Sequence, residues 1–243
     1  MLVRARFAAS STNVYGYKHR WINSSEQHKI PYLPRKIVCV AKNFRGRGEV
    51  GSYEPSETMI FSKTVDSLID LAEPIILAGS QDMHYETELV LLMGRSLPIN
   101  RLGHDSLECV RSVIGLGIAL DLTLKDVQNS LKLRGAPWEL AKAFDRSCPM
   151  SGFIKAPANW WEKDRTVSLT IDGNIVQSQS TSEMIMAPGE LISFITKSIS
   201  LSEGDLILTG TPILPFPTQS LKPGQSLTAS ITGVGQFTTT VID

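Results

Sequence analysis

The feature that most constrains the fold of this chain is a series of short apolar or alternating runs separated by glycine and proline. Pro74, Gly79 and Gly94 divide the early runs, and such punctuation is typical of β-strands. The expected strands outnumber the expected helices and do not alternate regularly with them, which disfavours a doubly wound parallel sheet. The sequence therefore predicts a β-rich α+β fold. Its expected strands span residues 36–41, 59–61, 75–77, 85–93, 118–122, 166–171, 174–179, 205–208, 226–231 and 236–242.

A few helices complete this pattern. Asp105 and Thr123 are suitable N-caps, and Gly115 or Gly117 is expected to end the first helix. Pro188 fits the first turn of the last helix. The three expected helices span residues 105–114, 123–132 and 187–198. Between two of the strands, Asp172 and Gly173 predict a tight hairpin turn.

Composition restricts the kind of partner. Lysine plus arginine equal aspartate plus glutamate at 24 each, so no overall field would attract nucleic acid or an anionic membrane. No stretch approaches the roughly 20 apolar residues of a membrane span, and residues 1–11 lack the apolar run of a signal peptide. We expect a cytoplasmic protein with a small-molecule partner, in which an N-terminal arm (1–34) precedes one catalytic domain (35–243). Its three widely spaced cysteines are expected to be reduced and mostly buried.

Two glutamates mark the strongest candidate site. On a strand over residues 85–93, His84, Glu86 and Glu88 would point to the same face. Burying two adjacent carboxylates without a partner is costly, and a hard divalent cation would remove that conflict. The alternative is an edge strand with one face in water.

Asp121 supports the metal hypothesis because it lies in an otherwise apolar run, where an acid needs a partner. Three carboxylates favour Mg²⁺, or Mn²⁺ or Ca²⁺, over Zn²⁺. For Asp121 alone, the alternative is a cap for the helix that follows it.

Two later segments offer groups for a substrate. Lys125 and Gln128 open a helix soon after Asp121, and Lys142 lies in a stretch between Trp138 and Phe144. A lysine in such surroundings can also be a snorkelling side chain. The segment Thr209, Gly210, Thr211 ends an apolar run with small residues that let a ligand approach the backbone, although it can equally be an ordinary exit from a strand.

Several strings together resemble the fumarylacetoacetate hydrolase family. They include His84-Tyr-Glu-Thr-Glu-Leu, Ala119-Leu-Asp-Leu-Thr-Leu-Lys-Asp-Val-Gln128, Gly135-Ala-Pro-Trp-Glu-Leu-Ala-Lys-Ala-Phe144 and Glu203-Gly-Asp-Leu-Ile-Leu-Thr-Gly-Thr-Pro212. The resemblance implies mixed β-sheets in a sandwich or roll, a homodimer, and a metal held by Glu86, Glu88 and Asp121. It also implies substrate contacts from Lys142, Gln128, Lys125, Lys63 and the segment 209–211.

The chain departs from this family in two places that bear on the reaction. Lys125 stands where many relatives have arginine, so the bidentate fork is lost. Relatives also have a histidine and a glutamate on a lid loop, where this chain has Arg47 and Val50. Arg45 and Arg47 are instead candidates to contact a second carboxylate of the substrate.

The expected chemistry follows from the metal. A cation that chelates the carboxylate and the 2-oxo oxygen of a small 2-oxo acid stabilises an enolate. Tautomerisation, decarboxylation and C–C bond hydrolysis all pass through an enolate. Hydrolysis also needs a base to activate water, so the missing histidine favours isomerase or decarboxylase chemistry over an acylpyruvate hydrolase. A non-catalytic descendant that keeps the metal is a further alternative.

Overall fold

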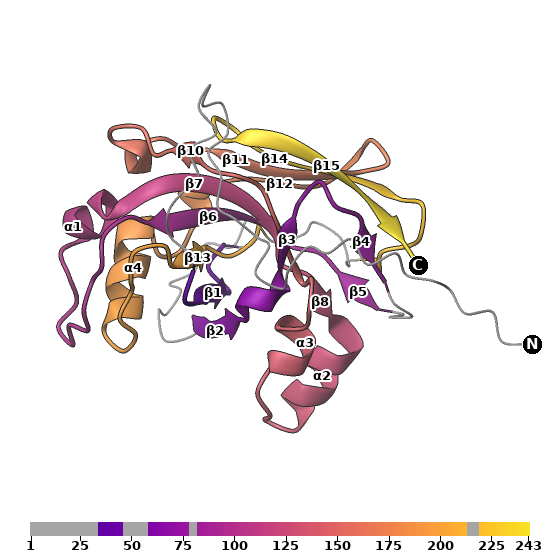
Figure 1. Cartoon of the computed structure of the whole chain (residues 1–243), viewed down its shortest axis with the longest axis horizontal. Coiled ribbons are helices and arrows are strands. Elements are labelled where there is room, and N and C mark those ends of the chain that lie inside the picture. Colours follow the sequence, from indigo (N-terminus) through magenta and orange to yellow (C-terminus); the bar gives the residue numbers. More distant parts are fainter. Residues whose placement is uncertain (1–33, 46–57, 78–81, 213–218) are drawn as a thin grey trace, which may run out of the picture.

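The computed structural model describes residues 34–45, 58–77, 82–212 and 219–243, and these residues form two facing β-sheets with a few helices at the ends (Figure 1). This confirms the predicted β-rich α+β fold. The eight-stranded sheet has the order β2-β1-β13-β6-β7-β9-β3, with β10 beside β7. Its strands are β1 (Ile37–Ala41), β2 (Met59–Lys63), β3 (Leu68–Asp70), β6 (Thr87–Met93), β7 (Val113–Leu120), β9 (Cys148–Met150), β10 (Ile154–Lys155) and β13 (Leu206–Leu208).

The second sheet has five strands in the order β12-β11-β14-β15-β4. These are β4 (Ile75–Ile76), β11 (Thr166–Ile171), β12 (Asn174–Ser180), β14 (Ser226–Ile231) and β15 (Gly235–Ile242). Two further strands, β5 (Met83–His84) and β8 (Thr123–Leu124), pair with each other. Asp172 and Gly173 have positive φ angles of 51° and 80°, which confirms the predicted hairpin turn between β11 and β12.

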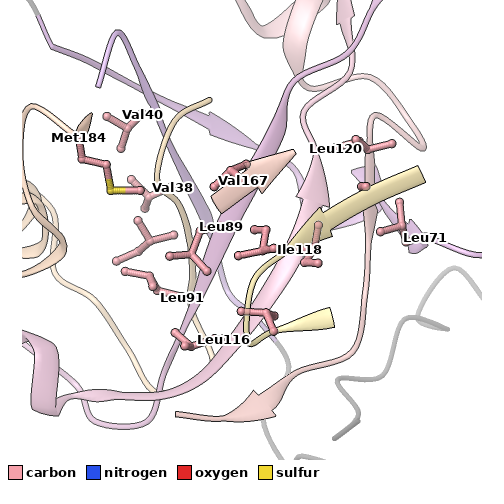
Figure 2. Close-up of a cluster of buried hydrophobic side chains, with 14 of the residues drawn as sticks. Val38, Val40, Leu71, Leu89, Leu91, Leu116, Ile118, Leu120, Val167 and Met184 are labelled. Carbon is pink, nitrogen blue, oxygen red and sulfur yellow. The ribbon is translucent and has the colours of Figure 1, made fainter. Parts of the chain in front are cut away.

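The main core lies between the two sheets (Figure 2). Leu89 and Leu91 of β6 and Ile118 of β7 face Val167 and Leu169 of β11 in this cluster. Because side chains alternate along a strand, Val90 and Leu92 point to the opposite face of β6, where they join a smaller buried cluster with Ala119 of β7. Glu88 shares the face of Val90, and Asp121 shares that of Ala119. The strand pattern therefore directs both acids toward the smaller cluster.

The helices lie at the ends of the sheets, with α1 and α4 at one end and α2 and α3 at another (Figure 1). They span α1 (Ser106–Arg111), α2 (Lys125–Leu133), α3 (Glu139–Lys142) and α4 (Pro188–Thr196). Asp105 caps α1 as predicted, accepting from the backbone N–H of Leu107 at 2.9 Å. Pro188 begins α4, and Glu190 accepts from Ala187 N–H at 3.2 Å.

The residues predicted to end the first helix and to cap the second have other roles. α1 ends at Arg111, and Gly115 and Gly117 lie within β7 instead of ending a helix. A Cβ on Gly117 would come within 3.0 Å of the Phe153 ring, so these glycines serve the packing of an aromatic side chain onto the strand. Thr123 does not cap α2, because it pairs with His84 between β8 and β5.

Two further expectations concern cysteines and membranes. Cys39, Cys109 and Cys148 are free and buried, as predicted. Among the described residues, no helix is long and apolar enough to cross a membrane. The N-terminal arm predicted for 1–34 lies outside the described residues, except for residue 34.

Candidate active site

The candidate site forms at the start of β6 and at the ends of its two neighbours, β7 and β13. Antiparallel pairing places the start of β6 beside the end of β7, with Thr87 opposite Leu120. On the other side of β6, the end of β13 runs alongside it, with Leu208 opposite Val90. This arrangement brings together residues that lie far apart in the sequence.

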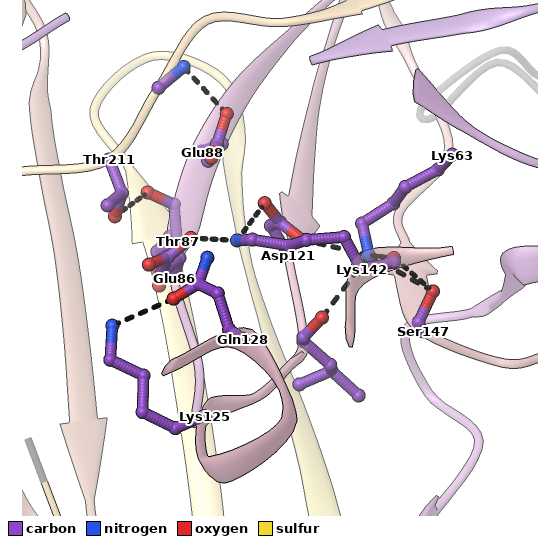
Figure 3. A network of polar contacts seen from close by, with 12 residues as sticks. Lys63, Glu86, Thr87, Glu88, Asp121, Lys125, Gln128, Lys142, Ser147 and Thr211 are labelled. Atoms are coloured by element: carbon purple, nitrogen blue, oxygen red, sulfur yellow. Dashed lines mark hydrogen bonds and ion pairs between the residues drawn. The ribbon is translucent and has the colours of Figure 1, made fainter. Parts of the chain in front are cut away.

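Three carboxylates meet at this point (Figure 3). Glu86, Glu88 and Asp121 each offer an oxygen, and these oxygens lie within 4.8 Å of one another. Glu88 and Asp121 are buried, at 2% and 0% exposure. β6 is an interior strand of its sheet, so the alternative of an edge strand in water is wrong. The cap alternative for Asp121 also fails, because its side chain contacts two lysines.

His84 is not part of the carboxylate cluster. It lies opposite Thr123 where β5 pairs with β8, in the same register in which Thr87 of β6 lies opposite Leu120 of β7. His84 Nε2 lies 2.7 Å from Asp82 Oδ1 instead.

Lys142 lies within the carboxylate cluster. Its Nζ donates to Glu86 Oε2 at 2.6 Å and to Asp121 Oδ2 at 2.7 Å, and its side chain is only 3% exposed. This burial rules out the snorkelling alternative, which requires an ammonium group in water. Burial alone would lower the pKa of Lys142, but Asp121 and Glu86 outweigh it and raise the pKa above the usual value. The two carboxylates therefore favour the charged form of Lys142.

Lys63 forms an ion pair with the other carboxylate oxygen of Asp121. Its Nζ lies 2.8 Å from Asp121 Oδ1 and donates to Leu122 O at 3.2 Å and Ser147 Oγ at 3.0 Å. It also donates to the backbone carbonyl of Lys142. The Lys63 side chain is fully buried, and these contacts direct its ammonium toward protein groups.

The two buried acids respond differently to these lysines. Burial raises the pKa of Asp121, but Lys142 and Lys63 more than offset it, so the pKa lies below the usual value. Burial also raises the pKa of Glu88, and the charges of Asp121 and Glu86 raise it further. Glu88 is the carboxylate with the least compensation from positive charge.

The donor set fits a hard divalent cation. Its three candidate ligands are carboxylates, the groups that Mg²⁺ and Mn²⁺ prefer. Three carboxylates face the ammonium groups of Lys63 and Lys142, so ionisation of all three would leave one negative charge without compensation. A divalent cation would compensate that charge.

The segment after β13 contacts the same cluster. Gly210 N–H donates to Glu88 Oε2 at 2.6 Å. Gly210 has a φ of +92°, and a Cβ there would lie 3.0 Å from the Asn43 Cβ, so the position requires glycine. The hydroxyls of Thr209 and Thr211 donate to the carbonyls of Leu89 at 3.0 Å and Thr87 at 2.9 Å. This segment is thus held against β6.

The remaining predicted residues lie around this centre. Figure 3 shows Lys125 and Gln128 extending from α2 toward the cluster, with Lys125 Nζ donating to Gln128 Oε1 at 3.1 Å. Arg45 is exposed, and its backbone bonds to Glu183 O at 3.0 Å and Gln179 Nε2 at 2.9 Å. Arg47 and Val50 lie outside the described residues.

Two residues of this network were not anticipated from the sequence. Ser147 accepts from Lys63 and donates to Lys142 O at 2.9 Å. Gln177, from the five-stranded sheet, contacts both Thr87 and Thr211. Both are polar side chains with 0% exposure, and the sequence carries no signal of that burial.

Comparison with known proteins gives the chain its family. Residues 36–242 match the family described as fumarylacetoacetate (FAA) hydrolase C-terminal. The chain belongs to the fumarylacetoacetate hydrolase family. Within it, oxaloacetate tautomerase YcgM of Escherichia coli (strain K12) is 40% identical over 207 residues, which cover 84% of this chain and 91% of that protein.

Two further family members extend the comparison. The mitochondrial oxaloacetate decarboxylase of Dictyostelium discoideum is 37% identical over 205 residues, covering 82% of this chain and 90% of that protein. The crystal structure of Escherichia coli protein 1262 superposes with a TM-score of 0.79 at 35% identity, covering 93% of this chain and 99% of that one. The predicted family, fold and class of enzyme are confirmed, whereas the roles of individual residues stay predictions.

Proposed function

We propose that this protein is a divalent-cation-dependent tautomerase that interconverts the keto and enol forms of oxaloacetate or a closely related 2-oxo diacid. The cluster of Glu86, Glu88 and Asp121 around Lys142 is the observation that carries the proposal. The activity named for YcgM, which is 40% identical to this chain, supports the choice of substrate.

The proposed cation is Mg²⁺ or Mn²⁺, held by Glu86, Glu88 and Asp121. When bound, it would stabilise the negative charge that develops on the 2-oxo oxygen as the C3 proton passes to solvent water, which returns a proton to that oxygen to give the enol. We further infer a homodimer, as the family resemblance implies, and a location in the cytoplasm.

The side chains around the cluster have separate tasks in this proposal. Lys142 acts in this proposal as a positive charge and a hydrogen-bond donor. An ammonium group has three N–H bonds, of which two point to Glu86 and Asp121, so one remains for a substrate oxygen. Gln128 accepts from Lys125 through Oε1, which leaves its amide N–H groups for the substrate carboxylate.

Decarboxylation of oxaloacetate is the second candidate, because the Dictyostelium relative bears that name and the reaction passes through the same enolate. Acylpyruvate hydrolysis is less favoured. It needs a base that activates water, and the sequence has Arg47 and Val50 where many relatives have the histidine and glutamate pair.

The test is a set of parallel assays with Mn²⁺ or Mg²⁺. Loss of the ultraviolet absorbance of enol-oxaloacetate reports tautomerisation, pyruvate release reports decarboxylation, and cleavage of an acylpyruvate reports hydrolysis. We expect tautomerisation to be the fastest and to disappear in Asp121→Ala. If all three reactions run at the rate of the protein-free control while Mn²⁺ still binds, the protein is instead a non-catalytic metal-binding descendant.

A further inference from the structure

Gln177 closes a ring of hydrogen bonds beside the carboxylate cluster. Its Oε1 accepts from the backbone N–H of Thr87 at 3.1 Å. Its Nε2 donates to Thr211 Oγ1 at 2.7 Å and to Pro212 O at 3.2 Å. Thr211 Oγ1 in turn donates to the carbonyl of Thr87 at 2.9 Å, which completes the ring.

The direction of each bond in this ring is fixed by chemistry. The Thr87 carbonyl can only accept, so the hydroxyl of Thr211 must donate to it and can only accept from Gln177. The Gln177 amide therefore turns its oxygen to Thr87 and its nitrogen to Thr211, because the opposite orientation would place two donors and two acceptors against each other. As a result, the proton of the Thr211 hydroxyl is used within the fold.

The ring touches the proposed metal ligands on two sides. Thr87 lies between Glu86 and Glu88 in the sequence, so its position fixes where both carboxylates begin. Thr211 follows Gly210, whose N–H donates to Glu88. Gln177 itself comes from β12, the edge strand of the other sheet. One amide thus links the five-stranded sheet to the strand and the segment that present the cluster.

Packing alone does not require a glutamine at this position. Gln177 has 0% exposure, and a buried amide is costly unless its hydrogen bonds are made. An apolar side chain would fill the space at lower cost in desolvation. The amide provides what an apolar side chain cannot, namely a second hydrogen-bonded link between Thr87 and Thr211 beside their direct bond.

We propose that Gln177 is a positioning residue that sets Glu86 and Glu88 relative to the Thr209–Thr211 segment. It acts through Thr87 and Thr211 and does not contact the substrate. The inference rests on the proposed metal function, but it makes a separate claim, because the ring would shape metal binding whichever 2-oxo acid reacts.

The experiment compares Gln177→Met with Ile231→Val in the full-length protein. Methionine keeps the length of the side chain and deletes both hydrogen-bonding groups. Ile231 lies on β14 in the same sheet, is 1% exposed, and makes none of the ring contacts, so its variant reports a general loss of core packing. Mn²⁺ affinity is measured by calorimetry, together with kcat, KM and the melting temperature.

We expect Gln177→Met to weaken Mn²⁺ binding by about 10- to 100-fold, the range seen when outer-shell partners of metal ligands are removed. We expect kcat to fall as well, whereas Ile231→Val lowers the melting temperature and leaves Mn²⁺ affinity unchanged. A Gln177→Met protein with wild-type Mn²⁺ affinity and kinetics overturns the inference. If wild-type protein binds Mn²⁺ but turns over no 2-oxo acid, the proposed function is refuted. The positioning role of Gln177 is then tested by the Mn²⁺ affinity of Gln177→Met alone.

Thr211→Val provides a second route if Gln177→Met does not fold. It removes only the hydroxyl that links Gln177 to the Thr87 carbonyl, and we expect weaker Mn²⁺ binding. Unchanged affinity in this variant overturns the inference. When both variants fold, the double variant should have about the same Mn²⁺ affinity as whichever single variant binds Mn²⁺ less tightly. Either change breaks the same ring, so the two effects should not add.

Discussion

Lys63→Met should destabilise the protein far more than the loss of an ordinary lysine. The buried ammonium of Lys63 contacts Asp121 Oδ1, Leu122 O, Ser147 Oγ and the carbonyl of Lys142. Methionine keeps most of the volume but leaves Asp121 with one cation fewer. Breaking a buried ion pair on one side costs about 3–5 kcal/mol.

This cost converts into a measurable shift in melting temperature. Each kcal/mol corresponds to about 2–4 °C for a chain of this size, so Lys63→Met should melt roughly 10 °C below wild type. Differential scanning calorimetry of the metal-free protein measures the shift. Lys155→Met is the matched control, because Lys155 is exposed on β10 and should shift the melting temperature by no more than about 2 °C.

Lys142→Met distinguishes the contribution of Lys142 to stability from that of Lys63. Lys142 contacts Glu86, whose side chain is 27% exposed, so part of the charge left behind can be hydrated. Mn²⁺ should restore much of the stability lost in Lys142→Met, since it places positive charge at the same oxygens, but little of that lost in Lys63→Met. A Lys63→Met protein that melts within about 2 °C of wild type would refute the view that Lys63 holds Asp121 in place.

Three further predictions concern the site. Because the pKa of Glu88 is raised in the metal-free folded state, the folded protein keeps the Glu88 proton at pH values above the unfolded pKa of about 4.3. The free energy of unfolding should therefore fall as pH rises from that value to the folded pKa of Glu88. Chemical denaturation of Glu88→Gln should lack this fall, and an unchanged pH profile contradicts it. Lys142→Met should lose turnover while its Mn²⁺ affinity stays equal to that of wild type or increases. Wild-type kinetics in this variant would show that Lys142 has no role in turnover. The pair Arg47→His and Val50→Glu should gain acylpyruvate hydrolysis, and no gain would show that the missing pair does not steer the reaction.

Local patterns predicted much of this fold because they depend on neighbouring residues. The Asp172-Gly173 turn follows from backbone preferences, and Asp105 caps α1 through its own side chain. The prediction that Gly115 or Gly117 ends a helix was wrong because their role depends on a residue far away in the sequence. That residue, Phe153, occupies the space that their missing side chains leave.

The carboxylates of the site were also visible in the sequence, whereas their supports were not. Glu88 and Asp121 stand out because acids in apolar runs need partners. The cations that pair with Asp121 are set by the tertiary structure, which brings Lys63 to its Oδ1 and Lys142 to its Oδ2. Gln177 lies in a mixed strand whose sequence resembles a solvent-facing one, and only the packing of the two sheets buries it.

The most direct test of the central claim is a calorimetric titration of metal-free protein with Mn²⁺, run beside an oxaloacetate tautomerisation assay. Wild type should bind one Mn²⁺ per chain and become active as the site fills, and Asp121→Ala should show neither binding nor activity. Full activity in the presence of a strong chelator, or wild-type Mn²⁺ affinity in Asp121→Ala, would contradict the account.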